Sequence, residues 1–257
     1  MSDLVGKRVL VVGASSGIGR ETALQLAKAG ARVAFAARRL DRLEEAVEAA
    51  GEHCLAVSCD VRRDEDCEAA VGAAAGAFGG LDAVVYASGH SPLTRSHEAT
   101  GELWRSVIET NVIGAAMIAR HAIPHLQRSG GRLMLLGSSS VGRPYPGLVP
   151  YTTSKAALHE MARGLRNEYP WLRVTTFIVG PTITEFADGW DMDLAIEMHG
   201  RWSAEGYPAN AALPVEEMAS QVVAVLASPA RVEEVLVMPD VPAPEPGSSA
   251  PEAAEVP

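Results

Sequence analysis

The chain has 257 residues, 47% of them hydrophobic, which is enough to build the core of one sizeable domain. Its formal net charge of −10 argues against nucleic acid as a partner, because phosphate binding needs a basic surface. No apolar run reaches the roughly 18 residues of a membrane span and the first residues lack the pattern of a signal peptide, so we expect a cytoplasmic protein with no membrane partner.

The first predicted strand runs into a glycine-rich turn. Residues 8–12, RVLVV, form an apolar run typical of a buried parallel strand, and a helix is predicted to follow and to continue to Ala29. Glycines let the backbone bring its N–H groups against a pyrophosphate, and the amino end of the helix adds partial positive charge. An ordinary strand–helix turn is the alternative. We expect a nucleotide phosphate at Gly13, Ser15, Ser16, Gly17, Ile18 and Gly19.

The second predicted strand, residues 32–36, ends in Ala37, Arg38 and Arg39. Enzymes that bind NAD(H) usually have an acid about 20 residues past the glycine turn, where it accepts hydrogen bonds from the ribose 2′-hydroxyl. Ala37 cannot do so, whereas arginine binds phosphate through two charge-assisted hydrogen bonds. The sequence therefore favours NADP(H) over NAD(H), unless both arginines are solvated surface charges. Asp41 is predicted to be a helix N-cap, because it begins the capping-box sequence DRLE.

The middle of the chain continues the alternation of strands and helices. A strand is predicted over residues 54–58, a helix over 64–78 that ends at two glycines, and a strand over 81–86. A long helix follows over residues 100–127. Its apolar face is interrupted by Asn111, a polar residue that needs hydrogen-bond partners if it is buried.

The sequence gives little support for a metal site. Cys54, Cys59 and Cys67 have no CxxC spacing, and we interpret them as reduced thiols of a cytosolic protein. His121 and His125 are four residues apart, but no carboxylate or cysteine shares their spacing. We therefore expect no bound metal.

Residues 137–160 contain the strongest candidate for catalysis. They follow an apolar strand, residues 133–136, and open a helix in which Tyr151 and Lys155 lie four residues apart on one face. A free tyrosine has a pKa of about 10. A neighbouring ammonium is expected to lower that pKa by about two units, into the range of general acid/base catalysis. Ser138, at the end of the strand, could hydrogen-bond a substrate oxygen beside it, with Ser139 and Ser140 as alternatives. An ordinary surface pair on a helix is the other interpretation.

The last part of the chain completes the pattern. Predicted elements are a strand over 173–179, a helix over 215–227 and a strand over 234–238. Residues 186–214 gather tryptophan, methionine and tyrosine, which suggests a hydrophobic lid over a substrate or an oligomer contact. Residues 240–257 are rich in proline, serine and glutamate and are predicted to form a disordered tail. The alternation predicts an α/β fold, a single-domain Rossmann-like doubly wound parallel sheet over residues 1–239.

Taken together, these motifs resemble the short-chain dehydrogenase/reductase family. The resemblance rests on Gly13-x3-Gly17-x-Gly19, Ser138 and Tyr151-x3-Lys155, and it covers about residues 5–240. Two departures stand out. Tyr86-Ala87-Ser88-Gly89 replaces the usual Asn-Asn-Ala-Gly, and Glu185 stands where a threonine often binds phosphate.

The resemblance implies further roles for residues of this chain. Asn111, Ser138, Tyr151 and Lys155 would be catalytic, with Asn111 supporting proton resupply to the lysine. It also implies a dimer or tetramer. Besides the glycine-turn residues and both arginines, the cofactor would contact Asp60, Val61, Ala87, Ser88, Gly89, Tyr151, Lys155, Pro181, Ile183 and Thr184.

The sequence thus predicts an NADP(H)-dependent oxidoreductase that interconverts a carbonyl and an alcohol on a small molecule, with Tyr151 as general acid/base. Two other classes stay open at this stage. A lyase or epimerase without net redox chemistry could use the same tyrosine as a base. A nucleotide-sensing binding protein could use the fold without turnover.

Overall fold

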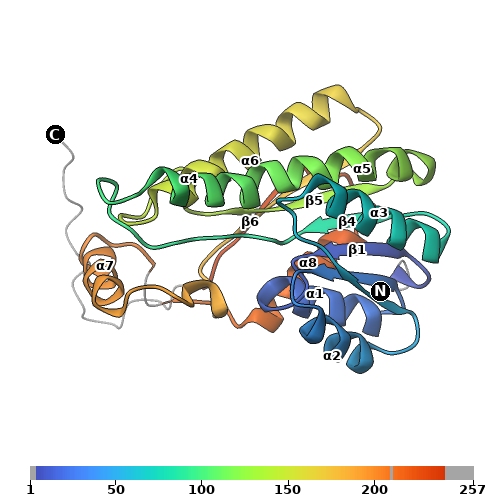
Figure 1. The fold of residues 1–257 in the computed structure, drawn as a ribbon, viewed down its shortest axis with the longest axis horizontal. Coiled ribbons are helices and arrows are strands. Elements are labelled where there is room, and N and C mark those ends of the chain that lie inside the picture. The colour runs from blue at the N-terminus through green and yellow to red at the C-terminus, as the bar shows by residue number, and fades with distance from the viewer. Residues whose placement is uncertain (1–3, 209–210, 241–257) are drawn as a thin grey trace.

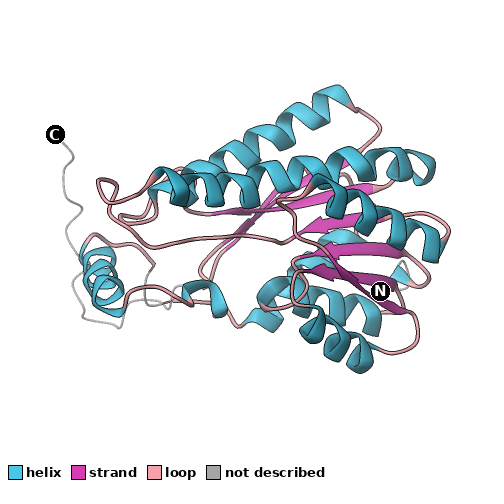
Figure 2. Cartoon of the chain, viewed as in Figure 1, coloured by secondary structure: helices cyan, strands magenta, loops and turns pink. Residues whose placement is uncertain are grey.

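A computed structural model of the chain describes residues 4–208 and 211–240. The tail predicted for residues 240–257 lies, apart from Asp240, outside the described residues. A central sheet is covered by helices on both faces (Figures 1 and 2). The chain therefore has the predicted doubly wound α/β fold.

Seven strands of the described residues pair in the order β3-β2-β1-β4-β5-β6-β7, and every pairing is parallel. The strand order reverses at β1, which pairs with β2 on one side and β4 on the other. Such a reversal opens a crevice at the carboxyl ends of the strands. The strands are β1 (Arg8–Val12), β2 (Arg32–Ala37), β3 (Cys54–Ser58), β4 (Ala83–Tyr86), β5 (Arg132–Ser138), β6 (Arg173–Val179) and β7 (Glu234–Val237).

Two groups of helices cover the sheet. Leu10 and Val12 of β1 pack towards one group, and Val9 and Val11 pack towards the other. Because both faces are buried, the strands are continuous apolar runs rather than alternating ones. No helix of residues 4–208 and 211–240 is both long and apolar enough to cross a membrane. The first group is α3 (Asp64–Phe78), α5 (Gly114–Ser129) and α6 (Val149–Glu168), and the second is α1 (Gly17–Lys28), α2 (Leu40–Ala50) and α8 (Val215–Ala227) (Figure 1).

Most predicted elements are present, and β3, α3, β6 and α8 have the predicted bounds. The prediction for Asp41 is wrong. Helix α2 begins at Leu40 with Arg39 at its N-cap, so Asp41 lies inside the first turn. There its charge still favours the positive end of the helix dipole. Two further segments lie beyond the carboxyl ends of the strands: the 3₁₀ turn η3 (Glu185–Ala187) and helix α7 (Met192–Ala204) (Figure 1).

The long helix predicted over residues 100–127 is present but contains a π-helical turn. Thr100 caps its amino end by accepting a hydrogen bond from the N–H of Leu103, and α4 (Gly101–Ile108) follows. The turn η2 (Glu109–Ile113) then joins α4 to α5, with the fully buried Asn111 at its centre. Such turns are frequent at functional sites.

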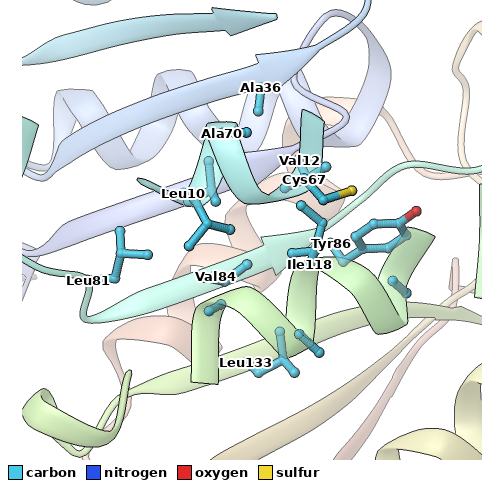
Figure 3. Close-up of a cluster of buried hydrophobic side chains, with 14 of the residues drawn as sticks. Leu10, Val12, Ala36, Cys67, Ala70, Leu81, Val84, Tyr86, Ile118 and Leu133 are labelled. Carbon is cyan, nitrogen blue, oxygen red and sulfur yellow. The ribbon is translucent and has the colours of Figure 1, made fainter. Parts of the chain in front are cut away.

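Tyr86 ties the sheet to this π-helical turn. Its ring belongs to the apolar core cluster between the sheet and helices α3 and α5 (Figure 3). Its hydroxyl donates a hydrogen bond to the carbonyl of Thr110. Gly114 permits the approach, because a Cβ there would lie 2.6 Å from the tyrosine oxygen. A tyrosine thus supplies a sheet-to-helix contact at the position where the resembled family usually has an asparagine.

We predict that Tyr86→Phe lowers the free energy of unfolding by about 1 kcal/mol, because it leaves the Thr110 carbonyl without this buried partner. Chemical denaturation measures the change. The matched control is Tyr169→Phe, which removes a hydroxyl at the protein surface. Equal stability of Tyr86→Phe and the unmodified protein would contradict the assigned role.

Candidate active site

A cavity of about 670 Å³ lies at the carboxyl ends of the strands. Gly13, Ala37, Ala87 and Ser138 each follow or end a different strand and line it. One end of the cavity is formed by the glycine turn and both arginines, and the other by Tyr151, Lys155 and aromatic side chains. Sequence positions far apart in the chain are therefore brought into one site.

The glycine turn is packed closely against neighbouring backbone, which only glycine permits at Gly13 and Gly19. Gly13 has a φ of +92°, and a Cβ there would lie 2.6 Å from the backbone nitrogen of Ser88. A Cβ on Gly19 would lie 2.3 Å from the carbonyl oxygen of Gly13. Helix α1 starts at Gly17 without a capping bond from the Ser16 side chain and without an acid in its first turn. Its amino end is thus free of competing side-chain acceptors and bears partial positive charge.

Arg39 lies against this turn. Its Nε and Nη2 donate to the Ser15 hydroxyl at 3.2 and 3.0 Å, and Nη2 also donates to the Ser16 hydroxyl at 2.8 Å. Arg38 lines the same end of the cavity. Asp60 lies there too, with its carboxylate hydrogen-bonded to Arg62, which lowers the pKa of Asp60. Val61, Ala87, Ser88 and Gly89 complete this wall.

Tyr151 and Lys155 lie on the first turns of α6, at the other end of the cavity. Only 8% of Tyr151 and 4% of Lys155 is exposed. The ammonium Nζ of Lys155 donates to the carbonyl of Leu136 at 2.7 Å and lies 5.7 Å from the centre of the Tyr151 ring. Ser138 ends β5 beside them, and its Oγ lies 2.9 Å from the Oγ of Ser140.

The pKa values of this pair differ from the sequence-based expectation. Burial raises the pKa of Tyr151 to about 12, although its hydrogen bond with Ser138 acts in the opposite direction. Burial also lowers the pKa of Lys155 to about 8. The sequence estimate considered the attraction between ammonium and phenolate and left out the cost of removing both from water. At neutral pH the tyrosine therefore carries its proton.

Asn111 does not line the cavity but lies behind it. Its Nδ2 donates to the carbonyl of His90 at 3.0 Å and to the hydroxyl of Ser154 at 2.8 Å, and its Oδ1 accepts from the N–H of His90 at 2.7 Å. A Cβ on Gly89 would lie 3.8 Å from Lys155 Nζ and 3.9 Å from Asn111 Oδ1. Asn111 and Lys155 therefore converge on the same glycine.

One predicted cofactor residue does not reach the cavity. The side chain of Ile183 is 66% exposed, and its backbone N–H donates to the carbonyl of Leu213 at 2.9 Å. Its neighbours Pro181, Thr182 and Thr184 line the cavity instead. The side chain of Ile183 is therefore turned towards solvent.

Aromatic rings form the outer wall of the cavity at the end that holds Tyr151 and Lys155. The ring of Phe186 packs edge-on against two other rings, with 5.2 Å between its centre and that of Tyr151 and 5.6 Å between its centre and that of Trp190. The ring centres of Trp190 and Trp202 lie 6.2 Å apart. Trp190 and Trp202 each donate their indole N–H to a backbone carbonyl, of Ser91 and Pro146 respectively. Tyr145, which packs against Trp202, also lines the cavity and was not singled out from the sequence.

His159 is a second residue that sequence reasoning missed. It lies one turn after Lys155 on α6 and accepts a hydrogen bond at Nε2 from the backbone N–H of Ser138, at 3.3 Å. Burial lowers the pKa of His159, and the charge of Lys155 acts in the same direction. Its spacing of four residues from Lys155 could have predicted from the sequence that it lies on the same face of the helix as the lysine.

The structure adds nothing in favour of a metal. Among residues 4–208 and 211–240, no group of three or more histidines, cysteines and acids could hold one. His121 is paired with Asp64 at 2.7 Å instead. The three cysteines are free.

Comparisons with known proteins extend these observations. The family model for short chain dehydrogenase matches residues 7–193. The chain is 36% identical to 11-beta-hydroxysteroid dehydrogenase A of Sesamum indicum over 195 residues, which cover 73% of this chain and 56% of that protein. It is 31% identical to hydroxynaphthalene reductase arp2 of Aspergillus fumigatus over 240 residues, which cover 88% of this chain and 87% of that one. The chain spans 49% of the length of 11-beta-hydroxysteroid dehydrogenase 1A of Arabidopsis thaliana.

Two solved structures share the fold. An alcohol dehydrogenase from Thermococcus sibiricus, complexed with 5-hydroxy-NADP, matches with a TM-score of 0.80 and 28% identity, over 93% of this chain and 99% of that one. A 3-ketoacyl-(acyl-carrier-protein) reductase from Brucella melitensis, complexed with NADH, matches with a TM-score of 0.78 and 25% identity, over 91% of this chain and 98% of that one.

We predict that Lys155→Met stabilises the cofactor-free protein at pH 7, because it removes a buried charge. The free energy of unfolding should rise by about 1–3 kcal/mol, and the melting temperature should rise with it. The folded pKa of Lys155 lies near 8, below its ordinary value of 10.5, so the cost of the charge is complete below pH 8 and fades as the pH rises towards 10.5. The difference between variant and parent should shrink over that range.

Differential scanning calorimetry between pH 7 and about 10 measures this difference. Lys28→Met, at the exposed end of α1, is the matched control and should show no such pH dependence. A melting-temperature difference that stays constant with pH would show that Lys155 is not strained by burial.

Proposed function

The chain belongs to the short-chain dehydrogenase family, and on that premise we propose that it is an NADP(H)-dependent oxidoreductase that interconverts a carbonyl and a secondary alcohol on an apolar small molecule. One observation carries the proposal: the glycine turn and the group of Ser138, Tyr151 and Lys155 line the same cavity. Nucleotide phosphates and a reacting carbonyl can therefore be held at opposite ends of one site.

The residues present fit a dinucleotide. The glycine turn lines the cavity, and the uncapped amino end of α1 offers partial positive charge to a pyrophosphate there. The predicted cofactor residues would hold it, apart from Ile183, whose side chain is turned to solvent. When bound, the nicotinamide supplies or accepts the hydride. The holding residues are Gly13, Ser15, Ser16, Gly17, Ile18, Gly19, Arg38, Arg39, Asp60, Val61, Ala87, Ser88, Gly89, Pro181 and Thr184, with Tyr151 and Lys155 at the nicotinamide end.

The chain's own residues supply the proton. Tyr151 keeps its proton at neutral pH, so its hydroxyl can donate to a substrate oxygen that becomes negative during reduction. Ser138 orients the same oxygen from the end of β5. Lys155, whose pKa of about 8 leaves it mostly charged at pH 7, stabilises the phenolate that forms. Asn111, hydrogen-bonded to Ser154 next to Lys155 on α6, would support proton resupply to the lysine from behind the cavity.

The raised pKa of Tyr151 bears on the direction of the reaction. It favours the protonated hydroxyl and thus reduction, whereas oxidation of the alcohol and a lyase or epimerase reaction would all begin from the phenolate. Net consumption of NADPH during the reaction separates a reductase from a lyase or epimerase.

The preference for NADP(H) is supported by the end of β2. Ala37 offers no acceptor to a ribose 2′-hydroxyl, and Arg38 and Arg39 line the cavity next to it. The solved relatives carry 5-hydroxy-NADP in one case and NADH in the other, so the preference rests on the residues of this chain.

The proposal extends to substrate, assembly and location. Phe186, Trp190 and Trp202 support a substrate with an apolar body, held under the described part of the predicted lid, residues 186–208 and 211–214. Exposed apolar side chains at Ile113 and Val149 support a homodimer or homotetramer. The free cysteines support a cytoplasmic location.

We predict that Tyr151→Phe lowers kcat by about 10²–10⁴-fold, because it removes the donated proton, while the affinity for NADPH changes little. Steady-state kinetics with a panel of aromatic and aliphatic ketones and NADPH fluorescence measure the two effects. Tyr169→Phe, at the surface, serves as the control. A Tyr151→Phe variant that keeps most of its activity would remove the mechanism.

We also predict that the unmodified enzyme uses NADPH with a higher kcat/KM than NADH, and that Arg38→Ala and Arg39→Ala each lower this value for NADPH by about tenfold or more. Their effect on NADH should be small, because its ribose has no 2′-phosphate. Arg128→Ala, on an exposed turn of α5, controls for the loss of a positive charge. A tenfold preference for NADH would overturn the assignment.

A further inference from the structure

Glu185 links two distant parts of the chain across the nucleotide end of the cavity. It is the first residue of η3, after β6, and its carboxylate accepts hydrogen bonds from Nη1 of Arg42 at 3.1 and 3.0 Å. The same carboxylate lies 3.6 Å from Nη1 of Arg39. Arg42 belongs to the first turn of α2, so Glu185 fastens the loop after β6 to the helix after β2.

This carboxylate lies where the proposed cofactor would place negative charge. Glu185 lines the cavity together with Ser15, Ser16 and Arg39, whereas Arg42 does not line it. A Cβ on Gly17 would lie 3.5 Å from the Cβ of Thr184, so the loop passes directly beside the glycine turn. A ribose phosphate bound by Arg39 would therefore come close to the Glu185 carboxylate.

The charge of Glu185 affects a ribose phosphate and a ribose hydroxyl differently. A phosphate monoester carries about −1.5 to −2 charges at neutral pH, and it takes the same guanidinium groups that a carboxylate takes. Glu185 competes with such a phosphate for Arg39 and repels it once it is bound. A ribose hydroxyl at the same place carries no charge and meets neither effect.

We propose that Glu185 is a specificity-determining residue that competes with the 2′-phosphate of NADP(H) for Arg39. This inference rests on the proposed function, because it takes the cofactor and the role of Arg39 from it. Glu185 weakens the binding of the phosphorylated nucleotide relative to the unphosphorylated one. The enzyme thereby binds NADP(H) less tightly than its two arginines alone would allow.

The exposure of the groups sets the size of the effect. The side chains of Glu185, Arg39 and Arg42 are 46%, 43% and 43% exposed. Ion pairs at such exposure are weak, so a phosphate can displace the carboxylate from Arg39. Glu185 can stay bound to Arg42 while this happens. We therefore expect a change in affinity of about three- to tenfold rather than a block.

The test measures nucleotide binding to the cofactor-free, full-length protein by isothermal titration calorimetry. The probes are adenosine 2′,5′-bisphosphate and adenosine 5′-monophosphate, which differ only in the 2′-phosphate. Glu185→Gln should tighten binding of the bisphosphate by about three- to tenfold and change binding of the monophosphate by less than about twofold. Glu185→Ala should act in the same direction. Glu160→Gln, which removes the same charge from a surface ion pair on α6, should change neither.

The outcomes separate the two roles that Glu185 can have. If it only fastens the loop, Glu185→Gln changes the binding of both probes alike or weakens the bisphosphate, and either result overturns the inference. In the double variant Glu185→Gln/Arg39→Ala, the gain in bisphosphate affinity should vanish. A gain that persists without Arg39 would also overturn it.

The same binding measurements distinguish a wrong NADP(H) assignment from a wrong role for Glu185. If Arg38→Ala and Arg39→Ala leave the affinity for the bisphosphate unchanged, the NADP(H) assignment itself is wrong. If they lower that affinity while Glu185→Gln leaves it unchanged, the assignment stands and only the role of Glu185 is removed.

Discussion

The geometry of the site depends on the burial of one ammonium group. Lys155 is almost completely removed from water, and its Nζ donates to the Leu136 carbonyl near the end of β5. Burying a charge is costly, so the packing of α6 against the sheet must hold the amine there. Tyr151, one turn earlier on the same helix, is fixed in the cavity wall by the same packing. Ser138 ends the strand that supplies the carbonyl, so all three groups share one rigid frame.

Hydrogen bonds within the chain, behind the cavity, reinforce this frame. The amide of Asn111 joins the π-helical turn to His90, in the loop after β4, and to Ser154, which precedes Lys155 on α6. Ser154 in turn donates to the carbonyl of Tyr151. Tyr86 adds a contact from β4 to the same turn. These hydrogen bonds fix the backbone around Tyr151 and Lys155, and electrostatic stabilisation of a reacting oxygen requires groups held in place in this way.

The sequence predicted the elements whose signals are local and missed the features set by tertiary contacts. Apolar runs and glycine stops gave α3 and β6 their bounds, and the Tyr151–Lys155 spacing gave the face of α6 that lines the cavity. The π-helical turn has no periodicity of its own, so the helix around Asn111 was predicted to be regular. The pKa of Tyr151 depends on burial, which a spacing does not show. The partners of Glu185 lie 143 and 146 residues away along the chain, so only the folded chain brings them together.

Adjacent residues of one loop serve both ends of the cavity. Glu185 is bound to Arg42 at the end of the cavity next to the glycine turn, and Phe186 packs against Tyr151 and Trp190 at the other end. Because one peptide bond joins them, a backbone movement that takes Glu185 away from Arg42 also moves the ring beside Tyr151. Trp190 is anchored in turn to the Ser91 carbonyl, so the ring contacts continue to the loop after β4. The two ends of the site are therefore connected through this short loop as well as through the rigid sheet beneath it.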